Sequence, residues 1–234
     1  MVHEGVDIFS TSDGGLVWRL VDHTALSGSS AGSLPVAGDK TGIMFNTARS
    51  GWATLMMPVT GLNGLYKTTD GGRTWSTASL PPPSGFDPSK DYASASLPIF
   101  FGTQDGSLTA NVSPPQGVSS LALYHTEDGG ISWSSVSIPT PTKWSRAVFA
   151  NASTWVLVGK SEMVITTDAG RQWRTVTIKQ PPAGGISNCL FVQFVSGDTG
   201  FAVQGNASNQ LWTTTDGGAT WRSVASTLAG STGS

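Results

Sequence analysis

Short runs of alternating apolar and polar residues recur along the chain, and each has the length and period of a β-strand. Tyr, Thr, Val and Trp alternate with other residues in "GLYKTT", "LALYHT", "TWSTASL" and "SWSSVSI". A period of two places successive side chains on opposite faces of a sheet. The runs come in pairs joined by a polar segment that contains glycine, and this arrangement predicts β-hairpins.

The joining segment is nearly the same in five places, which we call the repeat turns. They are STSDGGLVW, KTTDGGRTW, HTEDGGISW, ITTDAGRQW and TTTDGGATW, with Asp at positions 13, 70, 128, 168 and 216. Their shared frame is Thr-x-Asp-x-Gly-x-x-Trp. We expect the glycine to supply the positive φ of a hairpin turn and the Asp to accept backbone hydrogen bonds across it. The predicted structural residues are Asp13, Gly15, Trp18, Asp70, Gly72, Trp75, Asp128, Gly130, Trp133, Asp168, Gly170, Trp173, Asp216, Gly218 and Trp221.

Two further strand-like runs precede each of the last four repeat turns. Four antiparallel strands per repeat, at a spacing near that of known blades, predict an all-β propeller. The predicted blades span residues 41–80, 97–139, 144–178 and 187–226, with part of another at 1–22, all in a single propeller domain or fragment. One Trp at a fixed place in each blade suits packing between neighbouring blades.

The frame of the repeat turns resembles the Asp-box, also called the bacterial neuraminidase repeat, Ser/Thr-x-Asp-x-Gly-x-Thr-Trp. The resemblance extends over nearly the whole chain, and "FVSGDTGFAVQGNASNQLWTTTDGGATW" reads like a complete blade. Similar repeats occur in sialidases, xyloglucan-active hydrolases, sortilin-type receptors and photosystem II assembly factors. The resemblance implies that the turn joins the third and fourth strands, is structural, and lies away from any functional site.

Two copies depart from the frame, and the first blade is incomplete. Copy one has Val17 at the Thr position, and copy four has Ala169 and Gln172. Both turns should still form, because the Asp, the second glycine and the Trp remain. Residues 1–22 supply little more than two strands, so we expect the chain to be the C-terminal part of a larger propeller or an excised piece. A natural open or irregular ring is the alternative.

Composition and charge narrow the partner classes. Charged residues make up 12% of the chain and the net charge is −2, without a basic cluster, so a nucleic-acid partner is not expected. The hydroxyl-rich surface favours an extracellular or cell-envelope protein, although the chain carries no signal-peptide pattern. No apolar run is long enough to cross a bilayer. Single carboxylates in the turns and scattered histidines predict no metal site, and we expect no cofactor.

Loop length indicates where a ligand would bind. In an up-and-down blade, the repeat turn shares one end of the sheet with the first-to-second turn, and the longer links lie at the other end. We therefore predict binding of a protein or glycan partner at the long-loop end. The candidate residues are Phe86, Asp87, Asp91, Tyr92, Trp144 and Arg146. Trp144 fits blade packing equally well, and the long links could also be tolerated insertions.

A glycoside hydrolase is the alternative function. A sialidase-like site needs an arginine cluster and a nucleophilic Tyr, and the arginines here are dispersed. A xyloglucanase-like site needs two carboxylates facing one cleft. Asp39, Asp87 and Asp91 precede inner strands at the long-loop end, so a pair among them is conceivable. We favour solvated loop carboxylates and a non-catalytic binding module.

Overall fold

The computed structural model describes residues 5–24, 32–57, 59–182, 184–205 and 210–224. The outer ends of the predicted ranges 1–22 and 187–226 therefore lie outside the described residues. Two compact units make up the chain, Met1–Thr142 and Lys143–Ser234, and each is treated separately below. No helix among the described residues has the length and hydropathy needed to cross a membrane.

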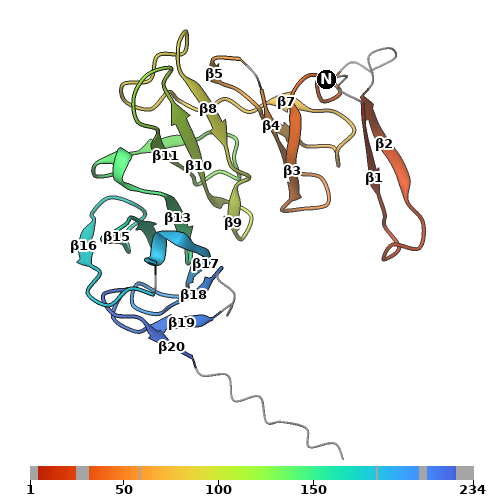
Figure 1. Cartoon of the computed structure of the whole chain (residues 1–234). Helices are drawn as coiled ribbons and strands as arrows, with labels where there is room; N and C mark the ends of the chain where they lie inside the picture. Colours follow the sequence, from red (N-terminus) through yellow and green to blue (C-terminus); the bar gives the residue numbers. More distant parts are fainter. Residues whose placement is uncertain (1–4, 25–31, 58, 183, 206–209, 225–234) are drawn as a thin grey trace, which may run out of the picture. The chain divides into compact units, whose positions relative to one another are not determined.

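The first unit contains an N-terminal hairpin and two blades (Figure 1). The hairpin consists of β1 (Val6–Ser10) and β2 (Arg19–Thr24), joined by the first repeat turn. Blade 1 has the strand order β3-β4-β6-β7, all antiparallel. Its strands are β3 (Asp39–Phe45), β4 (Gly51–Met56), β6 (Leu65–Thr68) and β7 (Ser76–Thr77).

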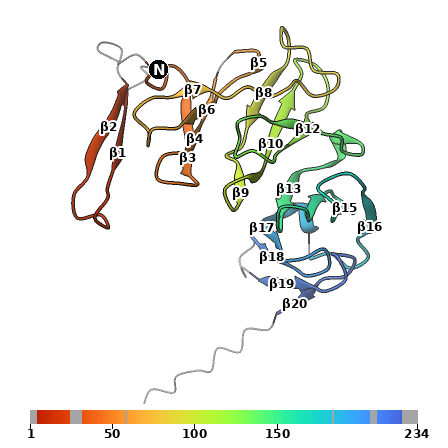
Figure 2. The ribbon, with the colours of Figure 1, turned by 180° about the vertical axis from the view of Figure 1, so that it is seen from behind.

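Blade 2 has a split first strand, seen from behind in Figure 2. Both β8 (Tyr92–Ala95) and β9 (Ile99–Phe101) pair with β10 (Asp105–Ser113), which is followed by β11 (Ser120–Thr126) and β12 (Ser134–Val136). A two-residue strand, β5 (Gly61–Leu62), joins β8 in parallel. The sheet therefore extends back to Tyr92, where the sequence pattern predicted a link. The nine-residue length of β10 explains the difference, because its far half provides the pairing partners of β8.

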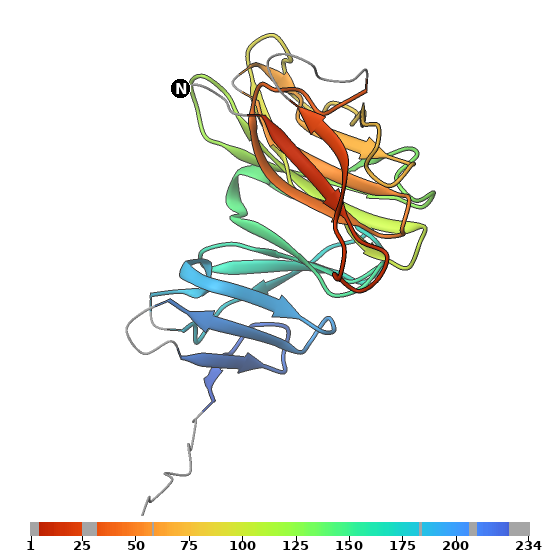
Figure 3. The ribbon, with the colours of Figure 1, turned by 90° about the vertical axis from the view of Figure 1, so that its right-hand side faces the viewer.

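The second unit contains blades 3 and 4, drawn from cyan to blue in Figure 3. Blade 3 consists of β13 (Arg146–Phe149), β14 (Trp155–Val158), β15 (Glu162–Thr166) and β16 (Arg174–Thr177). Blade 4 consists of β17 (Cys189–Phe194), β18 (Gly200–Gln204), β19 (Leu211–Thr214) and β20 (Arg222–Ser223). The described helices are two 3-10 turns, η1 (Pro141–Lys143) and η2 (Ile186–Asn188). An all-β fold of four propeller blades and part of another is confirmed.

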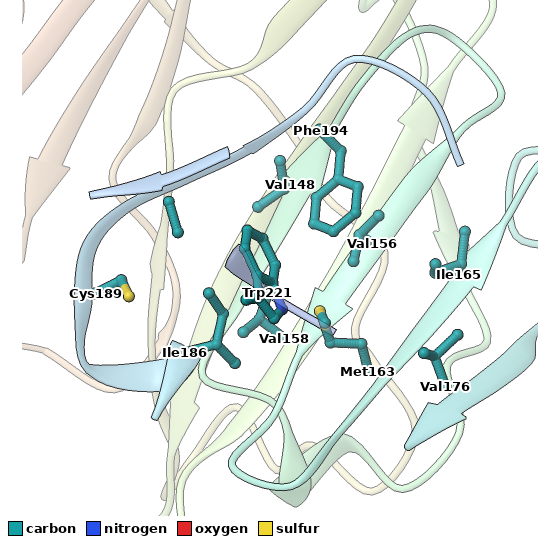
Figure 4. Close-up of a cluster of buried hydrophobic side chains, with 11 residues drawn as sticks. Val148, Val156, Val158, Met163, Ile165, Val176, Ile186, Cys189, Phe194 and Trp221 are labelled. Carbon is teal, nitrogen blue, oxygen red and sulfur yellow. The ribbon is translucent and has the colours of Figure 1, made fainter. Parts of the chain in front are cut away.

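Within each unit, the Trp of a repeat turn packs against the preceding blade. Trp133 of blade 2 shares a buried cluster with Trp52 and Leu65 of blade 1. Trp221 of blade 4 is buried among Val156, Met163 and other side chains of blade 3 (Figure 4). Trp75 likewise packs with Ile8 of the N-terminal hairpin. Burial of large aromatic surface is a major source of stability at such interfaces. Trp18, in the first turn, is 60% exposed.

The second glycine of a repeat turn is required for two reasons. Gly130 has φ 73° and Gly218 has φ 89°, conformations that L residues with side chains rarely adopt. In addition, a Cβ on Gly130 would lie 2.8 Å from the Trp52 ring of the preceding blade. The turn glycine thus allows the next blade to approach closely.

One hydrogen-bond pattern closes all five repeat turns. In the turn of blade 1, the Thr68 hydroxyl donates to Asp70 (2.9 Å) and accepts the Gly72 N–H (2.9 Å). The Asp70 carboxylate also accepts the N–H groups of Arg73 and Thr74 and the Thr74 hydroxyl. The same Thr-to-Asp and Gly-to-Thr bonds recur in the other four turns. The two divergent turns therefore form as predicted. In them the carboxylate still accepts the N–H of Val17 or Gln172.

Each repeat turn of the four blades is also tied to the first-to-second turn of its own sheet. The N–H of the residue after the Asp donates to a carbonyl of that turn at 2.8–2.9 Å, in Gly71 to Arg49, Gly129 to Gln104, Ala169 to Ser153 and Gly217 to Asp198. We call this contact the turn latch. It places both turns at the same end of each sheet, as the up-and-down connectivity predicted.

Acidification is expected to unfold the protein through these turns. Partial burial raises the pKa of Asp70, but the Thr74 hydroxyl and N–H, the Thr68 hydroxyl and the Arg73 N–H lower it by more, to about 2. The pKa is also lowered in Asp13, Asp128, Asp168 and Asp216. A carboxyl group whose pKa is lowered on folding contributes its full stabilisation above the unfolded value of 3.8, so this stability should be lost progressively as the pH falls from about 4 to about 2. Urea midpoints measured across that range should show the loss, and it should be smaller in Asp70→Asn. An equal loss in the variant would contradict the assignment.

Candidate binding groove

The link between blades 1 and 2 folds into a tight loop around two carboxylates. The Asp91 carboxylate accepts the Asp87 N–H (2.9 Å), and the Asp91 N–H donates to the Asp87 carbonyl (2.8 Å). Asp87 in turn accepts the Ser89 N–H and hydroxyl and the Lys90 ammonium group at 2.6–3.0 Å. Both carboxylates therefore bind groups of their own loop.

The ionisation of Asp87 follows from these contacts. Hydrogen bonds from Lys90 and then from Ser89 lower the pKa of Asp87 to about 2. The group is thus an anion at neutral pH. A catalytic general acid needs the opposite, a carboxyl group whose pKa is raised so that it still holds a proton.

The loop forms one wall of a groove over the end of blade 2, which we call the blade 2 groove. Its volume is about 360 Å³. The other walls come from the β10–β11 loop, the start of β11, the end of β12 and the segment that follows β12. The lining residues are Pro83, Ser84, Gly85, Phe86, Asp91, Val112, Pro114, Val118, Ser120, Leu121, Ala122, Ser135, Val136, Ser137, Ile138, Pro141 and Thr142.

The blade 2 groove is mainly aliphatic. Val112, Leu121 and Ala122 are buried at its base, whereas Val118 at its edge is 70% exposed. Hydroxyl groups of serines and a threonine supply the polar part of the lining. Asp91, which is 8% exposed, is the one ionisable residue among the described residues that line it. Apolar walls with a few polar groups are typical of ligand sites.

The predicted binding residues are distributed unevenly around this groove. Phe86 and Asp91 line it, and Asp87 holds the loop that carries them. Tyr92 lies in β8, is 46% exposed and is not part of the lining. Asp39 begins β3 of blade 1 and does not line the groove either.

Trp144 and Arg146 lie in the second unit and make contacts within it. Trp144 is 7% exposed, and a Cβ on Gly159 would lie 3.1 Å from its ring. The Arg146 guanidinium donates to the carbonyls of Ser187, Cys189 and Leu190 at 2.9–3.3 Å. It thus connects β13 of blade 3 to the start of β17 of blade 4. These contacts favour the alternative that Trp144 packs within its blade. Arg146 has a structural role, because it joins blades 3 and 4 through hydrogen bonds.

Sequence reasoning missed most of the aliphatic lining. Val118 lies in the loop between β10 and β11, whereas Val136, Ile138 and Pro141 follow a repeat turn, where no binding residue was predicted. The proline-rich stretch "IPTPT" from Ile138 to Thr142 was the available indication. Among the described residues, no group of three or more His, Cys, Asp or Glu could hold a metal ion.

Comparison with known proteins identifies the fold. No protein-family model matches the sequence, and no curated protein is significantly similar to it. The GH74 enzyme of Niastella koreensis matches at 14% identity and TM-score 0.57, over 94% of this chain and 36% of its own. The GH74 xyloglucanase of Xanthomonas campestris matches at 15% identity and TM-score 0.56, over 91% and 35%. A structure of YCF48 bound to a D1 peptide matches at 17% identity and TM-score 0.42, over 82% and 83%.

The two GH74 similarities establish the propeller fold alone. The chain spans about a third of the length of the two GH74 chains. All the identities are below 20%, and sites grafted onto a shared fold diverge in function. The function has to be argued from the residues of this chain.

Proposed function

We propose that the chain is a non-catalytic binding module that holds a segment of a partner protein in the blade 2 groove. The observation that carries the proposal is the lining: aliphatic side chains and hydroxyl groups surround one carboxylate, and that carboxylate is hydrogen-bonded to its own loop. Burial of a ligand's apolar side chains against such a surface favours binding by about 25 cal/mol for each Å² of apolar area removed from water.

The chemistry of the groove argues against hydrolysis. A glycosidase needs two carboxyl groups that flank the scissile bond, about 5–9.5 Å apart depending on the mechanism. Among the described lining residues, Asp91 has no second carboxylate beside it. Asp87, the nearest carboxylate in sequence, accepts hydrogen bonds from Ser89 and Lys90. The pKa of Asp87 is also shifted in the wrong direction for an acid catalyst.

A peptide fits the lining better than a glycan does. Glycan hydroxyl groups need many polar partners, because an unpaired buried polar group is costly. The lining contains no Asn, Gln, Arg, Lys, Trp or Tyr side chain among its described residues. Aliphatic residues and prolines instead match an extended peptide with apolar side chains.

Charge placed at the edge of the groove should weaken binding without affecting the fold. We expect peptides selected from a displayed library to bind the wild-type chain and to lose at least about tenfold in affinity for Val118→Lys, because an apolar side chain that is 70% exposed at the rim becomes a solvated charge. Ile131→Lys is the matched control, since Ile131 is 82% exposed in the same unit but belongs to a repeat turn. Equal affinity for both variants, measured by calorimetry, would exclude the groove as the binding site.

The hydrolase alternative has its own test. We expect no turnover of xyloglucan, other β-glucans or sialosides by the chain. Turnover that is lost in Asp91→Asn or Asp39→Asn, with the melting temperature unchanged, would replace the binding proposal by a hydrolase.

A further inference from the structure

The blade 2 groove contains one carboxylate that the fold has largely removed from water. Asp91 is 8% exposed, and its Oδ2 atom accepts the Asp87 N–H at 2.9 Å. Within the described part of the chain, its Oδ1 atom accepts no hydrogen bond. Oδ1 is not one of the described side-chain atoms that are fully buried and unbonded, so solvent still reaches it. A carboxylate can accept about four hydrogen bonds, and this one is therefore short of donors.

Strand pairing places Asp91 beside the aliphatic base of the groove. The residue immediately precedes β8, in which Ala93 lies opposite Val112 of β10. Side chains alternate between the two faces of a sheet, so positions 91 and 93 share a face with Val112. Val112 is buried and lines the groove together with Ala122 of β11. The carboxylate thus adjoins an aliphatic surface.

The charge of Asp91 is not balanced within the groove. Its neighbour Lys90 pairs with Asp87 instead, at 2.7 Å between the ammonium group and Oδ2. Two carboxylates and one ammonium group leave this loop with one negative charge in excess. Asp91 is the one ionisable residue among the described residues that line the groove. The groove therefore offers an anion to a cationic ligand.

A cation that binds here meets a carboxylate that is already desolvated. Ion pairs in a low dielectric attract strongly, but each partner has to lose its hydration. Asp91 has lost most of its hydration in the unbound protein, because the fold buries it. Only the cation of the ligand remains to be desolvated, and this favours pairing at the groove over pairing with an exposed carboxylate.

Lysine is the side chain that matches both the aliphatic surface and the single open oxygen. Its four-carbon stem packs along apolar surface while the ammonium group makes polar contacts at the tip. Arginine donates best as a fork to two carboxylate oxygens, whereas Oδ2 of Asp91 already accepts the Asp87 N–H. One open oxygen therefore favours an ammonium group over a guanidinium group.

We propose that the partner segment presents a lysine to the blade 2 groove, with its stem against the aliphatic lining and its ammonium group donating to Oδ1 of Asp91. The residues that flank this lysine are apolar, because Val118 and Ile138 continue the lining. This inference rests on the proposed function and specifies it. An extended peptide gains specificity from individual side chains that enter pockets, and here the lysine supplies that contact.

Selection of displayed peptides tests the charge requirement. One library of random peptides is selected on the wild-type chain and, separately, on Asp91→Asn, whose side-chain oxygen can still accept the Asp87 N–H. We expect lysine to be enriched at one position in the first set and not in the second. Equal lysine content in two sets that both bind in the groove would overturn the lysine assignment.

Synthetic versions of one selected peptide, all acetylated at the N-terminus, measure the pairing by calorimetry. Replacement of the peptide's lysine by methionine should weaken binding to the wild-type chain at least about tenfold, and binding to Asp91→Asn by less than about twofold. Replacement by arginine should weaken binding to the wild-type chain at least about threefold. Glu127→Gln is the control, since Glu127 is an exposed acid of the same unit outside the groove and should leave the affinity unchanged. Equal losses on the wild-type chain and Asp91→Asn would contradict a contact with Asp91.

The lysine assignment and the proposed function fail in different ways. Peptides that Val118→Lys weakens, but that bind Asp91→Asn and the wild-type chain equally, would overturn the lysine assignment and leave the groove as the binding site. A selection without any peptide sensitive to Val118→Lys would overturn both. Loss of binding on acetylation of the peptide would assign Asp91 to a partner's N-terminal ammonium group and contradict the lysine assignment.

Discussion

Replacement of Trp133 by alanine is expected to lower the free energy of unfolding by about 3–5 kcal/mol, the range for a fully packed Trp. Trp133 is 7% exposed and lies between blades 1 and 2, with its ring 6.3 Å from that of Phe100 and inclined at 65°. Phe100 in turn contacts Trp52 at a centroid distance of 4.6 Å. Removal of Trp133 therefore leaves a cavity in a cluster that joins two sheets.

The same substitution at Trp18 provides the control. Trp18 occupies the equivalent position of the first repeat turn in the same unit, but it is 60% exposed. We expect Trp18→Ala to change the unfolding free energy by less than about 1 kcal/mol. Urea denaturation followed by circular dichroism measures both variants. Similar losses would show that the Trp stabilises its own turn, and the interblade interpretation would fail.

Replacement of Asp128 by alanine is expected to have the next largest effect, about 2 kcal/mol, because hydrogen bonds to a charged group contribute more than neutral ones. The Asp128 carboxylate accepts the Thr126 hydroxyl at 2.7 Å, the Ile131 N–H at 2.9 Å and the Ser132 hydroxyl at 2.6 Å. Thr126 is 2% exposed, so its hydroxyl would lose its acceptor in a place that water hardly reaches. The loss should appear in thermal melts at neutral pH.

Glu127→Ala separates this effect from a simple change of charge. Glu127 is the neighbouring acidic residue, its side chain is 70% exposed, and its carboxylate lies 3.8 Å from the Nε2 atom of His125. Exposed pairs of this kind contribute about 0–1 kcal/mol. If Glu127→Ala and Asp128→Ala destabilised the protein equally, the turn hydrogen bonds would not explain why Asp recurs in all five repeat turns.

The repeat turns were predictable from sequence because their information is local. The Asp, the glycines and the Trp lie within six residues of one another, and their five copies fix both the hairpins and the number of blades. The role of the Thr hydroxyl, which bonds both the Asp and the second glycine, was not predicted although the Thr recurs in the frame. Its two partners become apparent only when the turn closes.

Features that depend on distant residues were not predictable in the same way. The segment "DYASAS" has little alternation of apolar residues, yet Tyr92–Ala95 is a strand because β10 offers it a partner. Arg146 was predicted as a candidate binding residue. The sequence alone did not indicate that its guanidinium also contacts carbonyls more than 40 residues away. The blade 2 groove combines four separate segments, of which only two were recognisable as long loops.

The turn latch has a consequence for how this molecule can vary in length. At the latched end of each sheet, an inserted residue in either turn would break a hydrogen bond of 2.8–2.9 Å between them. At the opposite end, the described connections make such bonds in single blades, as from the Gly61 N–H to the Asp91 carbonyl at 2.8 Å, and no one bond recurs in all four. Insertions, loop grafts and randomised libraries should therefore be tolerated at the groove end and rejected at the latched end. A scaffold of this kind can exchange its ligand by lengthening or recombining one set of loops while the hairpins beneath them keep their sequence.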